Sequence, residues 1–362
     1  MALAEIIRHR IGEEGPVSFH DFMEMALYHP KLGYYMAPPD KIGKNGDFYT
    51  SSSLGPVFGA MIGRQLEEMW HLTGGNEFTV VEYGAGTGVL CHDILDYLKN
   101  IPQLYDQLHY AIIEKSPAMC KKEKAHLQEK VSWCNSIHDL PDITGCILSN
   151  ELIDNFPVHQ VVMMDELMEV FVDDKNGFVE LLRPASKAIR DYMADLNIIL
   201  PKGFRTEINL EATQWIAVVA ASLKKGYVMT IDYGYHSEEL YKPCRNRGTL
   251  LCYHQHQIND QPFHYVGEQD ITAHVNFSAL CHWGHQNGLI CCGLTSQAQF
   301  LLALGFKEYL RNTADLTGNV AQLAMQEVML THTLLVDMGS KFKVLIQQKG
   351  MPVAELSGLK LS

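Results

Sequence analysis

The chain has 362 residues, and its 29 Lys and Arg against 42 Asp and Glu give a formal net charge of −13 at pH 7. With 47% hydrophobic and 20% charged residues, the composition is that of a globular protein with a sizeable core. The acidic balance argues against a protein that binds nucleic acid, because such a protein neutralises phosphates with a basic face.

The nine cysteines are scattered along the chain and are never spaced as Cys-x-x-Cys. This pattern is typical of reduced thiols in a cytoplasmic protein and does not fit a disulfide framework or a zinc site. The N-terminal stretch lacks the apolar core of a signal peptide, and the longest apolar run, residues 215–223, is too short to cross a bilayer. We therefore expect a cytoplasmic protein with no membrane partner.

The first 75 residues predict helices and loops. Ser18 is placed to cap a helix that runs through residues 19–26, and a second amphipathic helix is expected over residues 56–71. Between them lies a polar, glycine-rich stretch that contains Asp47 and Thr50. Two interpretations of this stretch stay open, a lid that folds over a cofactor and an ordinary loop before a helix.

From residue 78 onward, short apolar strands alternate with helices. Strands are predicted over residues 78–83, 110–113, 131–134 and 145–148, and helices over residues 89–99 and from Ser116. Strands that alternate with helices predict a parallel sheet covered on both faces.

The alternation changes after the fourth strand. Residues 158–179 alternate apolar and polar side chains around a turn at 174–177, which predicts an inserted antiparallel hairpin. Helices are expected at about 185–197 and 208–223, a core strand at 226–232, and an antiparallel edge strand at 342–346. We predict an α/β fold with a doubly wound, Rossmann-like sheet. Its parts are a helical cap (1–75), a core (76–350) with an insertion at about 158–225, and a tail (351–362).

The most informative motif, Glu82-Tyr-Gly84-Ala-Gly86-Thr-Gly88, follows the first strand directly. Glycines at these positions let the backbone turn tightly and approach a ligand closely. A dinucleotide fingerprint would place its third glycine at position 89, which is Val89 here. An acid two residues before the first glycine is typical of folds that bind S-adenosylmethionine (SAM), so we predict SAM as the cofactor.

Glu114 ends the second predicted strand, where its carboxylate is placed to accept both hydroxyls of a ribose. The simpler interpretation is that the glycines mark an ordinary turn and that Glu114 is an exposed strand end. The glycine cluster and Glu114 together favour a nucleotide-like cofactor over this alternative.

A polar segment, Ser149-Asn150-Glu151-Leu-Ile-Asp154-Asn-Phe-Pro, follows the fourth predicted strand. Ligands of open parallel sheets bind at the carboxyl ends of the strands. Two carboxylates can hold a planar guanidinium and polarise one of its nitrogens, so Glu151 and Asp154 are candidate catalytic residues, with Asn150 orienting cofactor or substrate. Alternatively, Asp154 caps a local turn and Glu151 is solvated.

Two other kinds of site are not indicated by the sequence. The segment at 149–157 lacks the Asn-Pro-Pro-Tyr pattern of enzymes that methylate nucleic-acid amines. The spacing of the histidines fits no metal site.

These motifs together resemble the MidA-type family of SAM-dependent methyltransferases, which includes the mitochondrial arginine methyltransferase needed for assembly of respiratory complex I. The matching stretches are residues 22–35 (FMEMALYHPKLGYY), 46–50, 58–59, 82–88, 150–158 (NELIDNFPV), 232–234, 247–250, 267–280 (GEQDITAHVNFSAL), 299–305 and 342–345. The late GEQD-x-TAHV-x-FS piece is most similar to bacterial members of the family.

The resemblance implies a class I methyltransferase core with family-specific additions. It implies that Glu82, the three glycines and Glu114 bind SAM, that Asp47 and Thr50 lie near the cofactor, and that Asn150, Glu151 and Asp154 line the reaction site. We expect methyl transfer to a protein side-chain nitrogen such as that of arginine. A methyltransferase of small-molecule oxygens or nitrogens and a non-catalytic SAM-binding assembly factor are the alternatives.

Overall fold

The computed structural model describes residues 2–36, 55–127, 130–255, 257–314, 328–352 and 354–360. The chain divides into two compact units, each assembled from three separate segments. The first unit takes Met1–Phe48, Ile153–Ile216 and Gly234–Trp283, and the second takes Tyr49–Leu152, Ala217–Tyr233 and Gly284–Ser362. Among the described residues, no helix combines the length and the apolar character that a membrane span requires.

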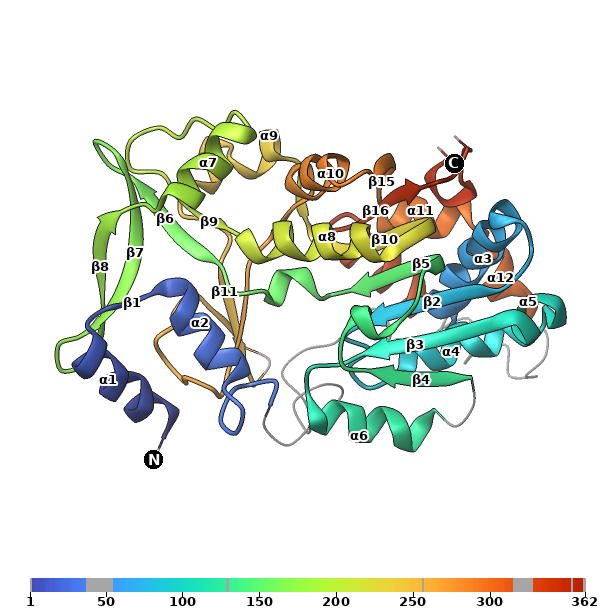
Figure 1. Ribbon diagram of the computed structural model, residues 1–362, viewed down its shortest axis with the longest axis horizontal. Helices are drawn as coiled ribbons and strands as arrows, with labels where there is room; N and C mark the ends of the chain where they lie inside the picture. The colour runs from blue at the N-terminus through green and yellow to red at the C-terminus, as the bar shows by residue number, and fades with distance from the viewer. Residues whose placement is uncertain are drawn as a thin grey trace. The chain divides into compact units, whose positions relative to one another are not determined.

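The second unit is built on seven strands of an eight-stranded sheet, in the order β15-β16-β10-β5-β2-β3-β4 (Figure 1). The strands β4, β3, β2, β5 and β10 are parallel, and β16 and β15 run antiparallel to their neighbours. The strands are β2 (Phe78–Tyr83), β3 (Leu108–Ile113), β4 (Val131–Cys134), β5 (Ile143–Asn150), β10 (Leu223–Tyr235), β15 (Ile290–Ser296) and β16 (Phe342–Lys349). The carboxyl ends of the parallel strands therefore lie at one edge, where ligands of such sheets bind.

Helices flank these strands along the chain. They are α3 (Pro56–Thr73), α4 (Val89–Leu98), α5 (Pro102–Gln107), α6 (Pro117–His126), η2 (Ile137–Asp139), α11 (Gln297–Ala303), α12 (Phe306–Ala314), the π-helical η5 (His332–Asp337) and η6 (Ser357–Leu359). The helices α8 (Leu210–Ser222) and α10 (Phe277–Gln286) and the strand β10 contain residues of both units.

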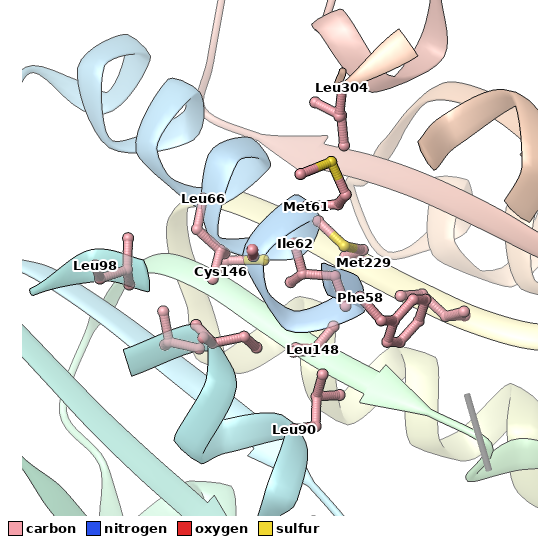
Figure 2. Packing of buried hydrophobic residues seen from close by; sticks show 14 of the residues in the cluster. Phe58, Met61, Ile62, Leu66, Leu90, Leu98, Cys146, Leu148, Met229 and Leu304 are labelled. Carbon is pink, nitrogen blue, oxygen red and sulfur yellow. The ribbon is translucent and has the colours of Figure 1, made fainter. Parts of the chain in front are cut away.

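The core of the second unit lies between the sheet and α3 and α4. Figure 2 shows buried side chains of these helices meeting those of β5 and β10, namely Phe58, Met61, Ile62, Leu66, Leu90, Leu98, Cys146, Leu148 and Met229. Two glycines bring the helices together: a Cβ at Gly59 would lie 2.4 Å from Asp93 Cβ, and one at Gly63 would lie 2.5 Å from Tyr97 Cδ1. Tight packing of this kind holds the carboxyl ends of the strands in fixed positions.

The first unit combines a five-stranded antiparallel sheet with a three-stranded one. The strands of these two sheets are β1 (Val17–Ser18), β6 (His159–Met163), β7 (Leu167–Asp174), β8 (Phe178–Pro184), β9 (Arg205–Ile208), β11 (Leu251–His254), β12 (Gln257–Asn259) and β13 (Asp270–Thr272). The short strand β14 (Val275–Asn276) pairs instead with Gly234 and Tyr235 of β10. The helices of the first unit are α1 (Leu3–Glu14), α2 (Phe19–Tyr28), η3 (Ile153–Asn155), α7 (Lys187–Asp195), α9 (Ser237–Leu240) and η4 (Pro243–Arg245). The rings of Phe22, Phe178 and Phe263 pack edge to face or tilted in its core.

Most predicted elements are confirmed. The strands over 78–83 and 131–134 have the predicted bounds, and α4 covers the helix expected over 89–99. Ser18 caps α2, where its Oγ accepts a hydrogen bond from the Asp21 N–H at 3.0 Å. The fold class is confirmed as well: an α/β fold with a parallel Rossmann-like sheet.

Two predictions need correction. The hairpin expected over 158–179 is a run of three strands, β6, β7 and β8, because the chain reverses at Met164–Glu166 as well as at 174–177. The strand at Phe342–Lys349 is antiparallel, as predicted, but it is not the edge of the sheet, because β15 pairs with its other side.

Candidate functional site

The three glycines that follow β2 adopt the left-handed conformations that favour glycine. Their φ angles are +65° at Gly84, +59° at Gly86 and +79° at Gly88. The Gly84 N–H donates to the Ile113 carbonyl at 2.9 Å, which anchors the glycine loop to β3. A Cβ at Gly86 would meet no atom of the described residues within 4 Å, so these residues leave space beside this backbone. Such a loop lets a ligand lie directly against the main chain.

Glu114 is held immediately after β3 by backbone donors. Its Oε1 accepts the Ser116 N–H at 2.7 Å, and its carboxyl is also hydrogen-bonded to the backbone of Gly86 and Lys115. Burial raises the pKa of Glu114, and these N–H groups oppose that rise. The structure thus brings Glu114 to the glycine loop, as the sequence predicts.

Glu82 lies near the end of β2, two residues before Gly84, and is buried, with 2% of its surface exposed. The Tyr110 hydroxyl donates to its Oε2 at 2.7 Å. Burial raises the pKa of Glu82 to about 7, against the lowering effect of this hydrogen bond, and the charge of Glu114 adds to the rise. Glu82 therefore shares a buried acidic environment with Glu114 and does not face solvent.

The buried Glu82 should make stability depend on pH. Its folded-state pKa lies above that of an exposed Glu, so between about pH 4.5 and pH 7 the folded state binds more protons than the unfolded state. The unfolding free energy should therefore fall as pH rises through this window, by about 3 kcal/mol from Glu82 alone. Urea unfolding of the cofactor-free protein between pH 5 and 8 measures this fall.

Replacing Glu82 with Gln should remove the Glu82 share of that dependence, because a neutral amide does not titrate; the raised pKa values of Glu114 and Glu123 leave the rest. The matched control is Glu77→Gln, since Glu77 is exposed just before β2. It should leave the pH dependence of the wild type unchanged. An unchanged slope in the Glu82→Gln variant would refute the assignment.

Asn150 ends β5 and Glu151 follows it directly, at the edge of the sheet that holds the carboxyl ends of the parallel strands. Glu151 has a φ of +52°, a left-handed conformation that is unfavourable for a residue with a Cβ. Its N–H donates to the Ile231 carbonyl of β10 at 2.9 Å, and the Asn150 Nδ2 donates to its Oε1 at 3.3 Å. Strained backbone of this kind is concentrated at functional sites.

Several buried polar atoms gather near this strand end. Asn150 Oδ1, Ser149 Oγ and Thr230 Oγ1 have no hydrogen-bond partner in the part of the chain that the structure describes. Ser149 and Thr230 face each other in the register of β5 and β10. Unsatisfied buried polar groups are costly, so these atoms indicate that a polar ligand completes the site.

Asp232 is a further acid that the sequence did not single out as a site residue. It is fully buried near the carboxyl end of β10, one residue after the Ile231 that binds Glu151. Its Oδ1 accepts the N–H of Tyr233 at 2.9 Å. Its position at the end of the core strand predicted over 226–232 is a signal that identifies it as a candidate.

Asp154 belongs to the other unit, where it is buried with 3% exposure. The Asn155 Nδ2 donates to Asp154 Oδ1 at 3.0 Å. The Tyr35 hydroxyl lies 2.7 Å from Asn155 Oδ1 and 2.8 Å from Asp270 Oδ1, so its one proton serves two acceptors. The contacts of this network that join residues more than 100 positions apart run from Tyr35 to Asn155 and Asp270, and Asn155 connects them to Asp154.

Two predicted site residues, Asp47 and Thr50, lie outside the described residues. Within the described ranges, no group of three or more His, Cys, Asp or Glu side chains is placed to hold a metal ion.

The polar groups of the candidate site in the second unit fit SAM. Glu114 suits ribose hydroxyls, the open backbone at Gly86 permits close approach, and the orphaned Asn150 Oδ1 suits an ammonium donor. A parallel sheet with this loop and this acid at its carboxyl edge defines a SAM-dependent methyltransferase of class I fold.

Comparison with known proteins gives the family. A family model described as "Putative S-adenosyl-L-methionine-dependent methyltransferase" matches residues 61–295, and the chain belongs to this family, the MidA-type methyltransferases. A relative from Burkholderia thailandensis, solved with S-adenosyl-homocysteine bound, is 31% identical with a TM-score of 0.88, and the match covers 98% of this chain and 94% of that one. The chain is therefore a SAM-dependent methyltransferase.

Curated relatives match over nearly the whole chain. The mitochondrial protein arginine methyltransferase NDUFAF7 homolog of Drosophila melanogaster is 27% identical, covering 98% of this chain and 86% of the relative. The human protein arginine methyltransferase NDUFAF7, also mitochondrial, is 27% identical, covering 93% of this chain and 81% of its own.

Proposed function

We propose that this methyltransferase acts on a guanidinium nitrogen of an arginine side chain in a protein. The observation that carries the proposal is the network of buried carboxylates and phenols around Asp154 and Asp270. Carboxylates bind the planar fork of a guanidinium through paired hydrogen bonds. The names of the full-length curated relatives support the same substrate class.

Aromatic rings add to the suitability of this region for a cation. Tyr28 and Tyr35 are stacked with their centroids 5.6 Å apart, and both are half-buried. The Tyr28 hydroxyl donates to the Asn155 carbonyl at 3.2 Å. Burial and then the charge of Asp270 raise the pKa of both phenols well above the ordinary value, so they stay neutral. Neutral rings beside carboxylates attract a guanidinium through both its charge and its flat face.

Methyl transfer from SAM requires the protein mainly to position the acceptor nitrogen and to take up the proton that this nitrogen loses. Bound SAM would supply an electrophilic methyl group on its sulfonium. We propose that Glu151 orients the acceptor nitrogen and accepts the proton that it loses. Asn150 would orient the cofactor, and Asp154, held by Asn155 within the first unit, stays a candidate for binding a guanidinium.

Methyl transfer to matched peptides tests the substrate class. The enzyme is incubated with tritiated SAM and peptides that differ only in one Arg or Lys, and the labelled amino acid is identified after acid hydrolysis. We expect label in methylarginine and none in the Lys peptide. Asp270→Asn should reduce the label in the Arg peptide while leaving SAM affinity unchanged.

Other outcomes assign the alternatives. Label in a small-molecule extract but in no protein would favour a small-molecule O- or N-methyltransferase. Tight SAM binding with a stable protein partner and no label in either would favour an assembly factor.

We also propose that the reaction takes place in the cytoplasm. Cys91, Cys146 and Cys252 are buried as thiols. Buried thiols that form no disulfide are typical of a reducing compartment.

A further inference from the structure

Glu123 of α6 is a buried acid to which the reaction described so far gives no role. Its residue surface is 0% exposed. The Trp133 Nε1 of β4 donates to its Oε2 at 2.8 Å. Its Oε1 is buried and receives no hydrogen bond from an N–H or O–H of the described residues. A carboxyl in this position is costly unless a proton or a partner satisfies it.

Glu123 lies against the cofactor loop. A Cβ built on Gly88 would lie 3.4 Å from the Glu123 Cα, so α6 passes directly beside the third glycine. The Glu123 carboxyl is also hydrogen-bonded to the carboxyl of Glu114. Glu114 in turn holds the backbone of Gly86 and Ser116. A chain of hydrogen bonds therefore joins Glu123 to the groups that line the cofactor site.

A hydrogen bond between two carboxyl groups requires one proton. Glu114 accepts several backbone N–H groups, which favour its ionised form, whereas Glu123 accepts one indole N–H. The proton therefore resides on Glu123, which donates to Glu114. Burial, followed by the charges of Glu114 and Glu82, raises the pKa of Glu123 to about 8, against the opposing hydrogen bond from Trp133.

The groups that face Glu123 are themselves acidic or neutral. They are Glu82 of β2, Glu114 after β3 and the Cys91 thiol of α4. Lys124 of α6 lies over the Trp133 ring, 5.2 Å from its centroid. The surroundings therefore favour the neutral form of Glu123.

We propose that Glu123 is a positioning residue for SAM: its protonated carboxyl donates to Glu114 and holds that carboxylate where it accepts the ribose hydroxyls. This inference rests on the ribose-binding role proposed for Glu114. When Glu123 loses its proton, two negative carboxylates face each other, the hydrogen bond is lost and Glu114 turns from its binding orientation. Affinity for the cofactor therefore falls as pH rises through the titration of Glu123.

Calorimetric titration with S-adenosyl-homocysteine between pH 6.5 and 9.5 tests the proposal. The wild type should lose about tenfold in affinity between pH 7 and pH 9. Glu123→Gln keeps a donor for Glu114 and an acceptor for Trp133 without a titrating proton. Its affinity at pH 7 should stay within about threefold of the wild type and persist at pH 9. The same tenfold fall in this variant would overturn the proposal.

A second variant separates positioning from packing. Glu123→Leu removes the donor, so at pH 7 it should bind S-adenosyl-homocysteine about as weakly as the wild type does at pH 9, and its affinity should not fall further as pH rises. It should bind an analogue that lacks the 2′- and 3′-hydroxyls as well as the wild type does, because Glu114 then has no ribose hydroxyl to accept. An equal loss for both ligands would show a merely structural role and overturn the proposal. Neither titration involves an acceptor, so failure of the arginine assignment leaves these results unaffected.

Discussion

Replacing Gly86 with Ala is expected to reduce SAM affinity by at least about 100-fold, or about 2.7 kcal/mol. Gly86 has a φ of +59°, and a Cβ there meets no atom within 4 Å in the part of the chain that the structure describes, so we expect the added methyl to enter the space that the cofactor needs. Calorimetric titration with SAM measures the loss. The left-handed backbone also strains an Ala by about 1–2 kcal/mol, which should appear as reduced thermal stability.

Gly288→Ala is the matched control for this strain. Gly288 belongs to the same unit, has a φ of +86°, and its nearest heavy atom to an added Cβ is Lys349 Cε at 4.0 Å. This variant should lose similar stability but keep wild-type SAM affinity. Equal loss of affinity in the two variants would show that strain alone disturbs binding, and unchanged affinity in Gly86→Ala would place the cofactor elsewhere.

The strands of the parallel sheet could be predicted because their signal is local. Runs such as Phe78-Thr-Val-Val and Tyr110-Ala-Ile-Ile are apolar on both faces and end in glycine or an acid, as buried parallel strands do. Ser18 likewise caps its helix through a residue three positions away. β15 was missed because Ile290-Cys-Cys-Gly has neither alternation nor a β-branched run, and its pairing partner lies about 50 residues later.

The cofactor loop could be predicted from the spacing of its glycines, whereas the buried Glu123 beside it could not. Glu123 stands in Lys-Lys-Glu-Lys, a sequence typical of a solvated helix face, yet its carboxyl is buried beside Trp133. The contact between Tyr35 and Asp270 spans 235 positions and leaves no local pattern. The left-handed φ of Glu151 is equally invisible, because glycine, not Glu, is the residue that marks such backbone.

Replacing Glu151 with Gln is expected to lower the rate of methyl transfer by at least about 100-fold, the usual effect of losing a general acid–base group. The amide keeps the size of the side chain but loses the charge and the capacity to accept a proton. SAM affinity should stay within about threefold, because the glycine loop and Glu114 are untouched. Single-turnover transfer and calorimetric titration measure the two quantities separately. Wild-type transfer would refute the role, and an equal loss of affinity would assign Glu151 to the cofactor site instead.

Glu151→Gly tests whether the strain at this residue is retained for function. At a φ of +52° a glycine is relaxed, so this variant should be stabilised by about 1 kcal/mol while its methyl transfer is lost. The natural Glu151 would then make the protein less stable than glycine does at this position, but it would place a carboxylate after the end of β5. The N–H of Glu151 donates to the Ile231 carbonyl there at 2.9 Å. A glycine variant that is both no more stable and fully active would show instead that the backbone conformation, and not the carboxylate, is what the site requires.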